Sequence, residues 1–408
     1  MLFQSFSEAS IRRVLRPADF FSGNTLRTID DLDPAIAKAV EVANSENPQL
    51  ESLSKSVIRN KETFRCEELH DQLILRKLND TLRRVFKTKQ ADRNYICRNT
   101  KRLLSEKVPF HLIKCDISSF YESVPIDQIE STIASSRIFS PETKRVLYSV
   151  LGASEIAHQK GLPRGLSISS TLAEKHLESF DKSIKGLQKV YFYGRFVDDI
   201  IVFAADGANA ILDHMRQTLN GIGLELNEGK TRVYRNRKQS SVCQSVGAIH
   251  DSLEFDFLGY EFSKPKYSKP ARARIAQSKI NKIRTRIVRS FLEYPKDGDA
   301  ALLKDRLRFL SGNYFISLHS AATPLRAGIF YSYPIADSSR SQLKELDKFL
   351  KAQIFSRQNI PQRRGRELSP ELKDQLGLLS FVAGYEERKL TEFTQQRISQ
   401  MKRAWRDV

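Results

Sequence analysis

The sequence predicts an α+β protein built around a ferredoxin-like (βαββαβ) domain, which is followed by a basic and mostly helical region. Between Leu112 and Phe262, strand-like and helix-like segments follow the order strand, helix, hairpin, helix, strand, which is the split β-α-β order. Two adjacent aspartates interrupt the apolar hairpin "YFYGRFVDDIIVFA". From Ser268 onward, segments rich in Lys and Arg repeat apolar residues at helical spacing.

Net charge indicates the kind of partner. The chain has 408 residues, with 67 Lys and Arg against 48 Asp and Glu, and a formal net charge of +19. Such an excess is self-repelling without a polyanionic partner, and nucleic acid is the commonest one. On charge alone, a soluble protein that is merely basic is the plain alternative.

The remaining composition is typical of a globular chain, with 40% hydrophobic and 28% charged residues. No apolar run reaches the length that spans a bilayer, and the N-terminal residues lack the apolar core of a secretion signal. We therefore expect no membrane contact and a cytoplasmic location. The cysteines lack CxxC spacing, so a zinc site or a disulfide framework is not expected. They are Cys66, Cys97, Cys115 and Cys243.

The elements before the hairpin are assigned from local patterns. Residues 1–80 are expected to be mostly helical, and residues 76–107 are crowded with basic side chains. The segment "HLIKCD", which ends at Asp116, has the pattern of a short buried strand. Residues 167–187 repeat apolar side chains at helical spacing and predict one helix.

The hairpin and the elements after it complete the predicted domain. Residues 208–223 carry apolar side chains on one helical face, and "SLEFDFLGYEF" has the pattern of a closing strand. In a sheet of this order, the end of the first strand lies near the hairpin turn. Asp116 is therefore expected beside Asp198 and Asp199, although 82 residues separate Asp116 from Asp198.

Three carboxylates brought together in a basic protein suggest a metal site for phosphoryl transfer. Two Mg²⁺ ions, or Mn²⁺ in their place, can be held by oxygen ligands and stabilise the attacking and leaving oxygens. The pair Asp198 and Asp199 alone is equally typical of an acidic turn. Its combination with Asp116 at a strand end favours the metal site.

Several consecutive motifs, from about residue 87 to residue 262, resemble those of reverse transcriptases in order and spacing. "DISSFY" resembles the first palm motif, "GLPRGLSISSTLAE" resembles the LPQG motif, and "FVDD" resembles the [YF]xDD box. "GLELNEGKT" resembles the motif with a lysine near the triphosphate, and "FLGY" resembles the strand that grips the primer. Arg164, Ser170 and Glu174 stand where the family usually has glutamine, proline and asparagine.

The resemblance implies an RNA-directed DNA polymerase that extends a 3′-hydroxyl with dNTPs. Asp116, Asp198 and Asp199 would bind the metals, and the carbonyl of Ile117 would complete a site. Lys230 would contact the pyrophosphate and donate a proton as it leaves. Tyr121 would stack on the incoming sugar where a ribose 2′-hydroxyl would clash. Further nucleotide contacts would come from Phe120, Arg164, Gly165, Arg93, Lys87 and Lys89.

Nucleic acid is expected along two segments in the second half of the chain. The "FLGY" segment would grip the primer, and a stripe of basic residues at helical spacing would follow the phosphate backbone without reading its sequence. The residues concerned are Phe257, Leu258, Gly259, Tyr260, Lys279, Lys282, Arg286 and Arg289.

The resemblance also implies a right-hand layout in three regions. Residues 1–110 would form an N-terminal helical region and the fingers. Residues 111–263 would form the palm, with elements of the fingers interleaved. Residues 264–408 would form a basic helical thumb and C-terminal region.

Within the group II intron and retron-like superfamily, the chain looks nearest to bacterial defence-associated enzymes of the type 3 group. "DISSFYES", the "FVDD" box and the C-terminal segments "FLSGNYFISL" and "AGIFYSYP" carry this resemblance. It implies an RNA template, expected to be a dedicated non-coding RNA, and a DNA product. A second polymerase subunit and a homo-oligomer are the further partners that it suggests.

Two alternatives remain open. A non-catalytic RNA-binding protein on an RRM-like fold shares the βαββαβ order, and "YGRFV" echoes the aromatic signature of its central strand. Asp198 and Asp199 on that strand would repel phosphates unless metals neutralised them. The second alternative keeps the fold but makes RNA or an untemplated polymer, and Tyr121 argues only against RNA synthesis.

Overall fold

The structure, a computed structural model, divides into two compact units. Unit 1 comprises Met1–Ile96 and Val108–Asp251, and unit 2 comprises Cys97–Lys107 and Ser252–Val408. The structure describes residues 4–22, 25–58, 60–156, 160–236, 241–245, 248–250, 253–264, 270–316, 325–337, 339–356 and 358–405.

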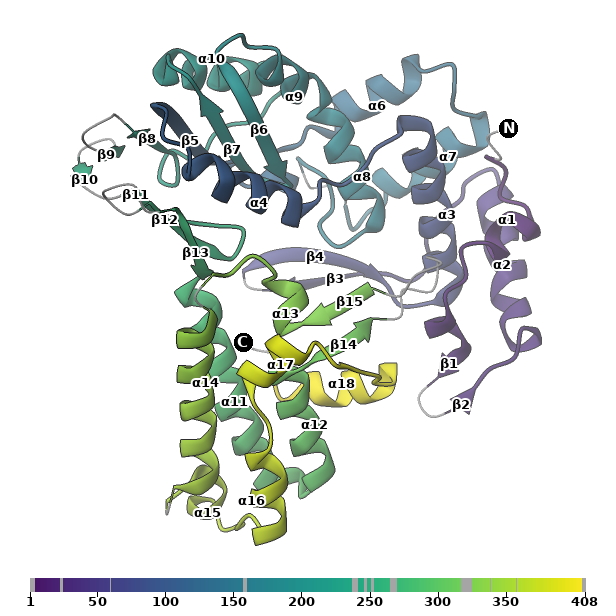
Figure 1. The fold of residues 1–408 in the computed structure, drawn as a ribbon. Helices are drawn as coiled ribbons and strands as arrows, with labels where there is room; N and C mark the ends of the chain where they lie inside the picture. Colours follow the sequence, from purple (N-terminus) through teal and green to yellow (C-terminus); the bar gives the residue numbers. More distant parts are fainter. Residues whose placement is uncertain are drawn as a thin grey trace. The chain divides into compact units, whose positions relative to one another are not determined.

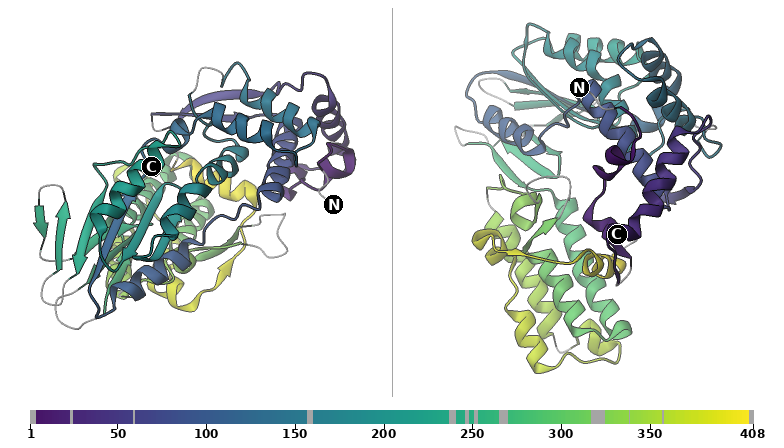
Figure 2. Two further views of the ribbon diagram at one scale, coloured as in Figure 1. Left: turned by 90° about the horizontal axis from the view of Figure 1, so that it is seen from above. Right: turned by 90° about the vertical axis from the view of Figure 1, so that its right-hand side faces the viewer.

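The main sheet of unit 1 has six strands in the order β10-β9-β8-β5-β7-β6 (Figures 1 and 2). Within it, β8, β5, β7 and β6 are antiparallel neighbours that stand in the order fourth, first, third, second. This is a split β-α-β sheet, so the predicted βαββαβ order is confirmed. The strands are β5 (Phe110–Asp116), β6 (Val190–Phe196), β7 (Asp199–Ala204), β8 (Arg232–Asn236), β9 (Ser241–Ser245) and β10 (Ala248–His250).

The closing strand is not the predicted one. β8 pairs with β5, whereas residues 252–262 contribute to β11 (Leu253–Phe257) and β12 (Tyr260–Lys264) of a separate sheet in unit 2. The chain returns to β5 directly after helix α10, because the amide of Asn227 donates to the carbonyl of Asp116 at 2.7 Å. A short strand placed there can pair with β5 at once.

Helices cover both faces of this sheet. α9 and α10 pack on one face, against β6 and β5 (Figure 1). Ile96 of α4 lies on β6 at Gly194, where an added Cβ would come within 2.8 Å of Ile96 Cγ2. A glycine at position 194 therefore permits the close approach of α4.

The other elements of unit 1 are mainly helical, as predicted for residues 1–80, but the hairpin β3–β4 was not predicted. The predicted helix over residues 167–187 is divided at Leu177, whose ψ of −2° interrupts the helical backbone. The helices are α1 (Glu8–Arg12), α2 (Asp33–Asn44), α3 (Leu69–Phe86), α5 (Phe120–Ser123), α6 (Ile126–Ser135), α7 (Pro141–Leu151), α8 (Ser167–His176), α9 (Glu178–Lys185) and α10 (Ala208–Asn220). The short elements are η1 (Pro17–Phe20), η2 (Asp30–Leu32), β1 (Phe21–Ser22), β2 (Thr25–Leu26), β3 (Leu53–Ile58) and β4 (Lys61–Cys66).

Unit 2 is a helical body with two small sheets. α11 packs against α12 and α14, which both contact α16 (Figures 1 and 2). The predicted basic helices are confirmed at α11 and α14, but the segment expected as a helix after residue 302 continues beyond α12 as strand β14. The helices are α11 (Gln277–Asp297), α12 (Ala300–Ser311), α13 (Ile329–Ser332), α14 (Ser339–Phe355), α15 (Ile360–Arg363), α16 (Pro370–Gly377), α17 (Phe381–Glu387) and α18 (Gln395–Arg403), and α4 (Arg93–Leu104) spans both units. The strands besides β11 and β12 are β13 (Arg272–Ile275), β14 (Asn313–Ile316), β15 (Leu325–Gly328) and β16 (Leu390–Thr391).

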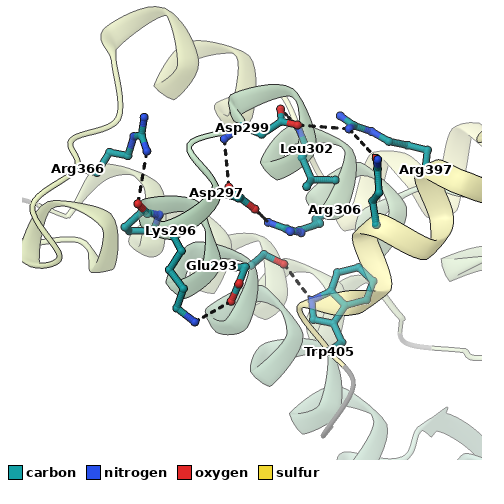
Figure 3. A network of polar contacts seen from close by, with 12 residues as sticks. Glu293, Lys296, Asp297, Asp299, Leu302, Arg306, Arg366, Arg397 and Trp405 are labelled. Carbon is teal, nitrogen blue, oxygen red and sulfur yellow. Dashed lines mark hydrogen bonds and ion pairs between the residues drawn. The ribbon is translucent and has the colours of Figure 1, made fainter. Parts of the chain in front are cut away.

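A network of polar contacts fastens the C-terminal helix to unit 2 (Figure 3). Arg306 pairs with Asp297 at 2.9 Å, and Arg397 of α18 pairs with Asp305 at 2.7 Å. The indole Nε1 of Trp405 donates to the carbonyl of Arg286 at 3.0 Å. Within the described ranges, no helix is long and apolar enough to pass through a membrane.

Candidate active site

Three aspartates meet at one end of the main sheet. Asp116 ends β5 and Asp199 begins β7, and the two residues are direct partners in the antiparallel register. Asp198 lies in the two-residue turn between β6 and β7. Its carbonyl accepts a hydrogen bond of 3.2 Å from the amide of Ile117. The predicted approach of Asp116 to Asp198 and Asp199 is therefore confirmed.

The clustered charges are unfavourable in the metal-free protein. Burial, and then the charges of Asp198 and Asp116, raise the pKa of Asp199 to about 6. Burial is also the main cause that raises the pKa of Asp198, and the charge of Asp116 adds to it. Both shifts mean that the ionised carboxylates lack compensating positive charge, which is what a divalent cation supplies.

Lys230 supplies part of that compensation. Its ammonium donates to Asp116 Oδ2 at 2.8 Å, and this hydrogen bond is the main cause that raises the pKa of Lys230. Asn227 holds the same turn, because its Oδ1 accepts the amide of Lys230 at 3.2 Å. The sequence prediction placed Lys230 in the site but missed Asn227. Asn227 lies three residues before Lys230 in a segment rich in turn-forming residues, and this position could have indicated its role in the turn.

The donor atoms of the cluster fit Mg²⁺ or Mn²⁺, because both ions prefer oxygen ligands. In the described part of the chain, no three His, Cys, Asp or Glu side chains already surround a common point as a finished metal site. Lys230 occupies Oδ2 of Asp116. Metal binding would therefore require the carboxylates to turn and Lys230 to give up Asp116.

A second group of polar residues lies around Tyr121. The guanidinium carbon of Arg164 is 5.1 Å from the centroid of the Tyr121 ring. Arg164 donates two hydrogen bonds to Glu122, at 3.0 and 3.3 Å, and Lys61 is 3.5 Å from the same carboxylate. Burial raises the pKa of Tyr121, and the charge of Asp198 contributes. Tyr121 and Arg164 are thus near the aspartates, and the sequence prediction missed Glu122 as their neighbour.

Two other predicted nucleotide contacts have clear structural roles. Phe120 is only 3% exposed and belongs to the hydrophobic core. Gly165 has φ +103°, and an added Cβ would lie 2.3 Å from the carbonyl oxygen of Phe64. Only glycine fits that backbone conformation and that close approach to β4. Tyr121, rather than Phe120, is the aromatic residue available to a ligand.

The remaining predicted nucleotide contacts lie where α3 is connected to α4. Lys87 and Lys89 are exposed just after α3, and Arg93 is the half-buried first residue of α4. Their contact with the triphosphate stays a prediction.

The predicted nucleic-acid residues belong to unit 2. Phe257 and Tyr260 flank the turn between β11 and β12, and both side chains are buried. This leaves Leu258 and Gly259 as the partly exposed part of that segment.

The basic stripe lies on α11 and is not uniform. Lys279 and Arg289 are exposed, whereas Lys282 and Arg286 are half-buried. The guanidinium of Arg286 lies 5.5 Å from the centroid of the Trp405 ring. Arg286 therefore also supports the packing of the C-terminal segment.

Comparison with known proteins gives one family match, over the middle of the chain. Residues 60–262 match the model of the family described as reverse transcriptase (RNA-dependent DNA polymerase). The match indicates a reverse transcriptase domain over these residues, which make up just under half of the chain. No curated protein matches the sequence.

Among solved structures, the chain is similar to apo telomerase from Candida tropicalis truncated from its C-terminal domain. The sequence identity is 13% and the TM-score is 0.36. The similarity covers 52% of this chain and 53% of the telomerase chain, so it spans about half the length of each.

The raised pKa of Asp199 predicts a specific pH dependence of stability. Because the folded state binds this proton more tightly than the unfolded state, the free energy of unfolding should fall as pH rises from about 4 to about 6. In EDTA at pH 7.5, Asp199→Asn should be more stable than wild type by about 2–3 kcal/mol. The difference should nearly vanish at pH 4. Thermal midpoints of both proteins across this range measure it.

Asp206, just beyond the other end of β7, provides the matched control. A hydrogen bond from the amide of Gly207 lowers its pKa, so Asp206→Asn should not be more stable than wild type at pH 7.5. Equal thermal midpoints for Asp199→Asn and wild type at both pH values would contradict a raised pKa of Asp199 in the folded protein.

Proposed function

We propose that the protein extends a 3′-hydroxyl with dNTPs on an RNA template by two-metal phosphoryl transfer. The observation that carries the proposal is the pairing of Asp116 with Asp199 across β5 and β7, beside Asp198, within a reverse transcriptase domain. The hydroxyl oxygen attacks the α-phosphorus, and the bond to pyrophosphate breaks. Bound Mg²⁺ or Mn²⁺ ions would stabilise the attacking and leaving oxygens.

The residues of the chain then have distinct tasks. Asp116, Asp198 and Asp199 would hold the ions, and the carbonyl of Ile117 would be a further ligand. Lys230, which donates to Asp116 in the metal-free protein, would turn to the leaving pyrophosphate and protonate it. Most of the rate acceleration comes from positioning and electrostatics.

Tyr121 and Arg164 form the nucleotide side of the proposed site. Tyr121 faces the sugar of the incoming dNTP and excludes a ribose. Arg164 offers the planar donors that suit a phosphate, and Glu122 balances its charge before a nucleotide binds.

We assign the right-hand layout on the same basis. Residues 1–110 with the interleaved segments of unit 1 would form the fingers, residues 111–263 the palm, and residues 264–408 the thumb and C-terminal region. The six-stranded sheet that carries the aspartates supports the palm, and the helical body with α11 supports the thumb.

A role in antiviral defence, with a dedicated non-coding RNA as template, completes the proposal. We also propose that the protein works with a second polymerase subunit and forms a homo-oligomer. The support is the motif resemblance to type 3 defence-associated enzymes. Sequencing the RNA that copurifies with the protein, and any DNA made on it, tests this part.

The RRM-like alternative is disfavoured by the contacts of β6. The hydroxyl of Tyr193 donates to Asp181 at 2.6 Å, and Arg195 is buried beside the same carboxylate. These residues of "YGRFV" are engaged within unit 1 and are not available as a platform for stacked bases.

Extension of a DNA primer on a defined RNA template tests the proposed function. With Mg²⁺ and one dNTP at a time, only the nucleotide complementary to the next template base should be added. Addition of any nucleotide regardless of the template would favour the untemplated alternative. RNA binding without addition of any nucleotide would favour the RNA-binding alternative.

The proposed backbone contacts of α11 predict a change in salt dependence. Replacement of Lys279, Lys282 and Arg289 by Gln should weaken template–primer binding equally for all sequences. Each lost phosphate contact should reduce the slope of log K against log salt by about 0.7–0.9. Arg286 is left intact because it contacts Trp405. Binding titrations at several salt concentrations measure the slope.

The control removes the same charge from another helix of unit 2. Lys344, Lys348 and Lys351 are exposed on α14, and their replacement by Gln should leave the slope nearly unchanged. An unchanged slope in the α11 variant would rule out backbone contacts on that helix.

A further inference from the structure

The turn that carries Asp198 contains a strained residue. β6 ends at Phe196 and β7 begins at Asp199, so that Val197 and Asp198 alone connect the two strands. Val197 has φ +60°, in the left-handed region that a β-branched side chain strongly disfavours. Backbone strain of this kind persists only where the surrounding structure holds it in place.

Arg195 is the residue that holds this turn. Its Nη1 donates to the carbonyl of Val197 at 2.9 Å. The Arg195 side chain is only 4% exposed, so this hydrogen bond is shielded from water. It links the last residues of β6 to the turn that presents Asp198 and Asp199.

Two carboxylates fix the guanidinium of Arg195 from the helical layer. Glu174 of α8 accepts two hydrogen bonds, at 3.1 Å from Nη1 and at 2.7 Å from Nη2. Asp181 of α9 accepts two more, at 2.8 Å from Nε and at 2.8 Å from Nη2. With the bond to Val197, all five donors of the guanidinium are used.

The planar fork of arginine suits this arrangement. A guanidinium can bind two carboxylates and one carbonyl at once, whereas an ammonium is a compact point charge with three donors. A buried ion pair is weak evidence for a purely stabilising role. Arg195, however, also donates to the carbonyl of Val197 in the strained turn. Its ion pairs with Glu174 and Asp181 therefore bear on the position of that turn as well as on stability.

We propose that Arg195, fixed by Glu174 and Asp181, is a positioning residue that holds the Val197–Asp198 turn so that Asp198 and Asp199 can bind the catalytic metals. This inference rests on the proposed function. It assigns a role to Glu174, one of the positions where the chain departs from the usual pattern of the family. It also makes the aspartate pair depend on two helices that contribute no metal ligand.

Arg195→Lys tests the proposal, because lysine keeps the charge but loses the planar fork. Mn²⁺ affinity of the protein without nucleic acid should fall about 10–100-fold, as is usual when a partner of a metal ligand is lost. In primer extension, the Mg²⁺ concentration for half-maximal rate should rise and kcat should fall, with KM for the dNTP little changed. The far-UV circular dichroism spectrum should match wild type.

Arg306→Lys is the matched control. Arg306 is 2% exposed and pairs with Asp297 at 2.9 Å within unit 2, so the same exchange disturbs a comparable buried ion pair. This variant should lose thermal stability but keep the Mn²⁺ affinity and the Mg²⁺ dependence of wild type. Equal losses of metal affinity in both variants would overturn the proposal, because they would reflect general destabilisation.

Val197→Gly distinguishes a positioning role of Arg195 from a purely stabilising one through its effect on Mn²⁺ affinity. Glycine adopts the positive φ without strain, so it should recover part of the lost Mn²⁺ affinity in the Arg195→Lys protein and give no gain in wild type. Absence of any recovery would overturn the idea that Arg195 holds a strained turn. Should Arg195→Lys not fold, Glu174→Gln replaces it and should lower Mn²⁺ affinity in the same direction.

The outcomes separate this inference from the proposed function. If wild type neither binds Mn²⁺ nor extends a primer, the proposed function is wrong. If wild type does both and Arg195→Lys equals it in Mn²⁺ affinity and Mg²⁺ dependence, only the positioning role is wrong.

Discussion

Asp198→Asn should reduce Mg²⁺-dependent nucleotide incorporation by at least about 1,000-fold, while the fold and RNA binding are retained. Metal ions supply several kcal/mol of transition-state stabilisation, and each 1.4 kcal/mol is worth about tenfold in rate. Asn keeps the size of the side chain but removes the charge that both ions would share. Loss of one charge from a repelling cluster should also make the metal-free protein slightly more stable. Single-turnover primer extension and a thermal melt in EDTA measure the two effects.

Asp213→Asn controls for the loss of a carboxylate. Asp213 is exposed on α10, where it pairs with Arg216 at 2.8 Å, so its replacement should leave incorporation near the wild-type rate. An Asp198→Asn protein that polymerises at a similar rate to Asp213→Asn would show that Asp198 is not a metal ligand.

Tyr121→Ala should admit rNTPs into the site. The guanidinium of Arg164 lies beside the Tyr121 ring. Burial raises the pKa of Tyr121, and the nearby charge of Asp198 adds to this shift. In the proposed complex, the ring fills the space that a ribose 2′-hydroxyl needs, and a dense interior accommodates an extra oxygen poorly. Removal of the ring should narrow discrimination between dNTP and rNTP by about 1–3 kcal/mol. Single-nucleotide extension with matched dNTP and rNTP measures the ratio.

Tyr121→Phe is the matched control, because the ring and not the hydroxyl should exclude ribose. Its preference for dNTPs should equal that of wild type. Phe120 cannot take over the role, since its side chain is buried in the core. If Tyr121→Ala discriminated between dNTP and rNTP as sharply as wild type, another residue would have to exclude ribose.

The βαββαβ order of the elements was enough to predict the aspartate cluster. Apolar runs marked β5 and the hairpin, and a two-residue turn leaves little freedom in where Asp198 and Asp199 lie. The closing strand was misassigned because "RVYRN" and "LEFDF" are both short strand-like segments after α10. Periodicity does not say which of them pairs with β5.

The polar contacts of the site were harder to predict. Arg195 lies 14 residues from Asp181 and 21 from Glu174 along the chain, and nothing local indicates that these charges meet in the interior. The hairpin β3–β4 was missed for a different reason: "LSKSVIRNKETFRC" lacks a clear apolar alternation. The glutamate at position 174, unusual for the family, was the one sign of the network around Arg195.

The number of Mn²⁺ ions held by the assembled complex tests most directly whether the three aspartates form a two-metal site. The complex contains the protein, an RNA template, a primer that ends in a 3′-deoxynucleotide, and the matching dNTP, so no reaction occurs. Wild type should hold two Mn²⁺ ions by electron paramagnetic resonance. A variant combining Asp116→Asn, Asp198→Asn and Asp199→Asn should hold at most the one ion carried by the nucleotide. Equal numbers of ions in the two complexes would contradict a metal site at these aspartates.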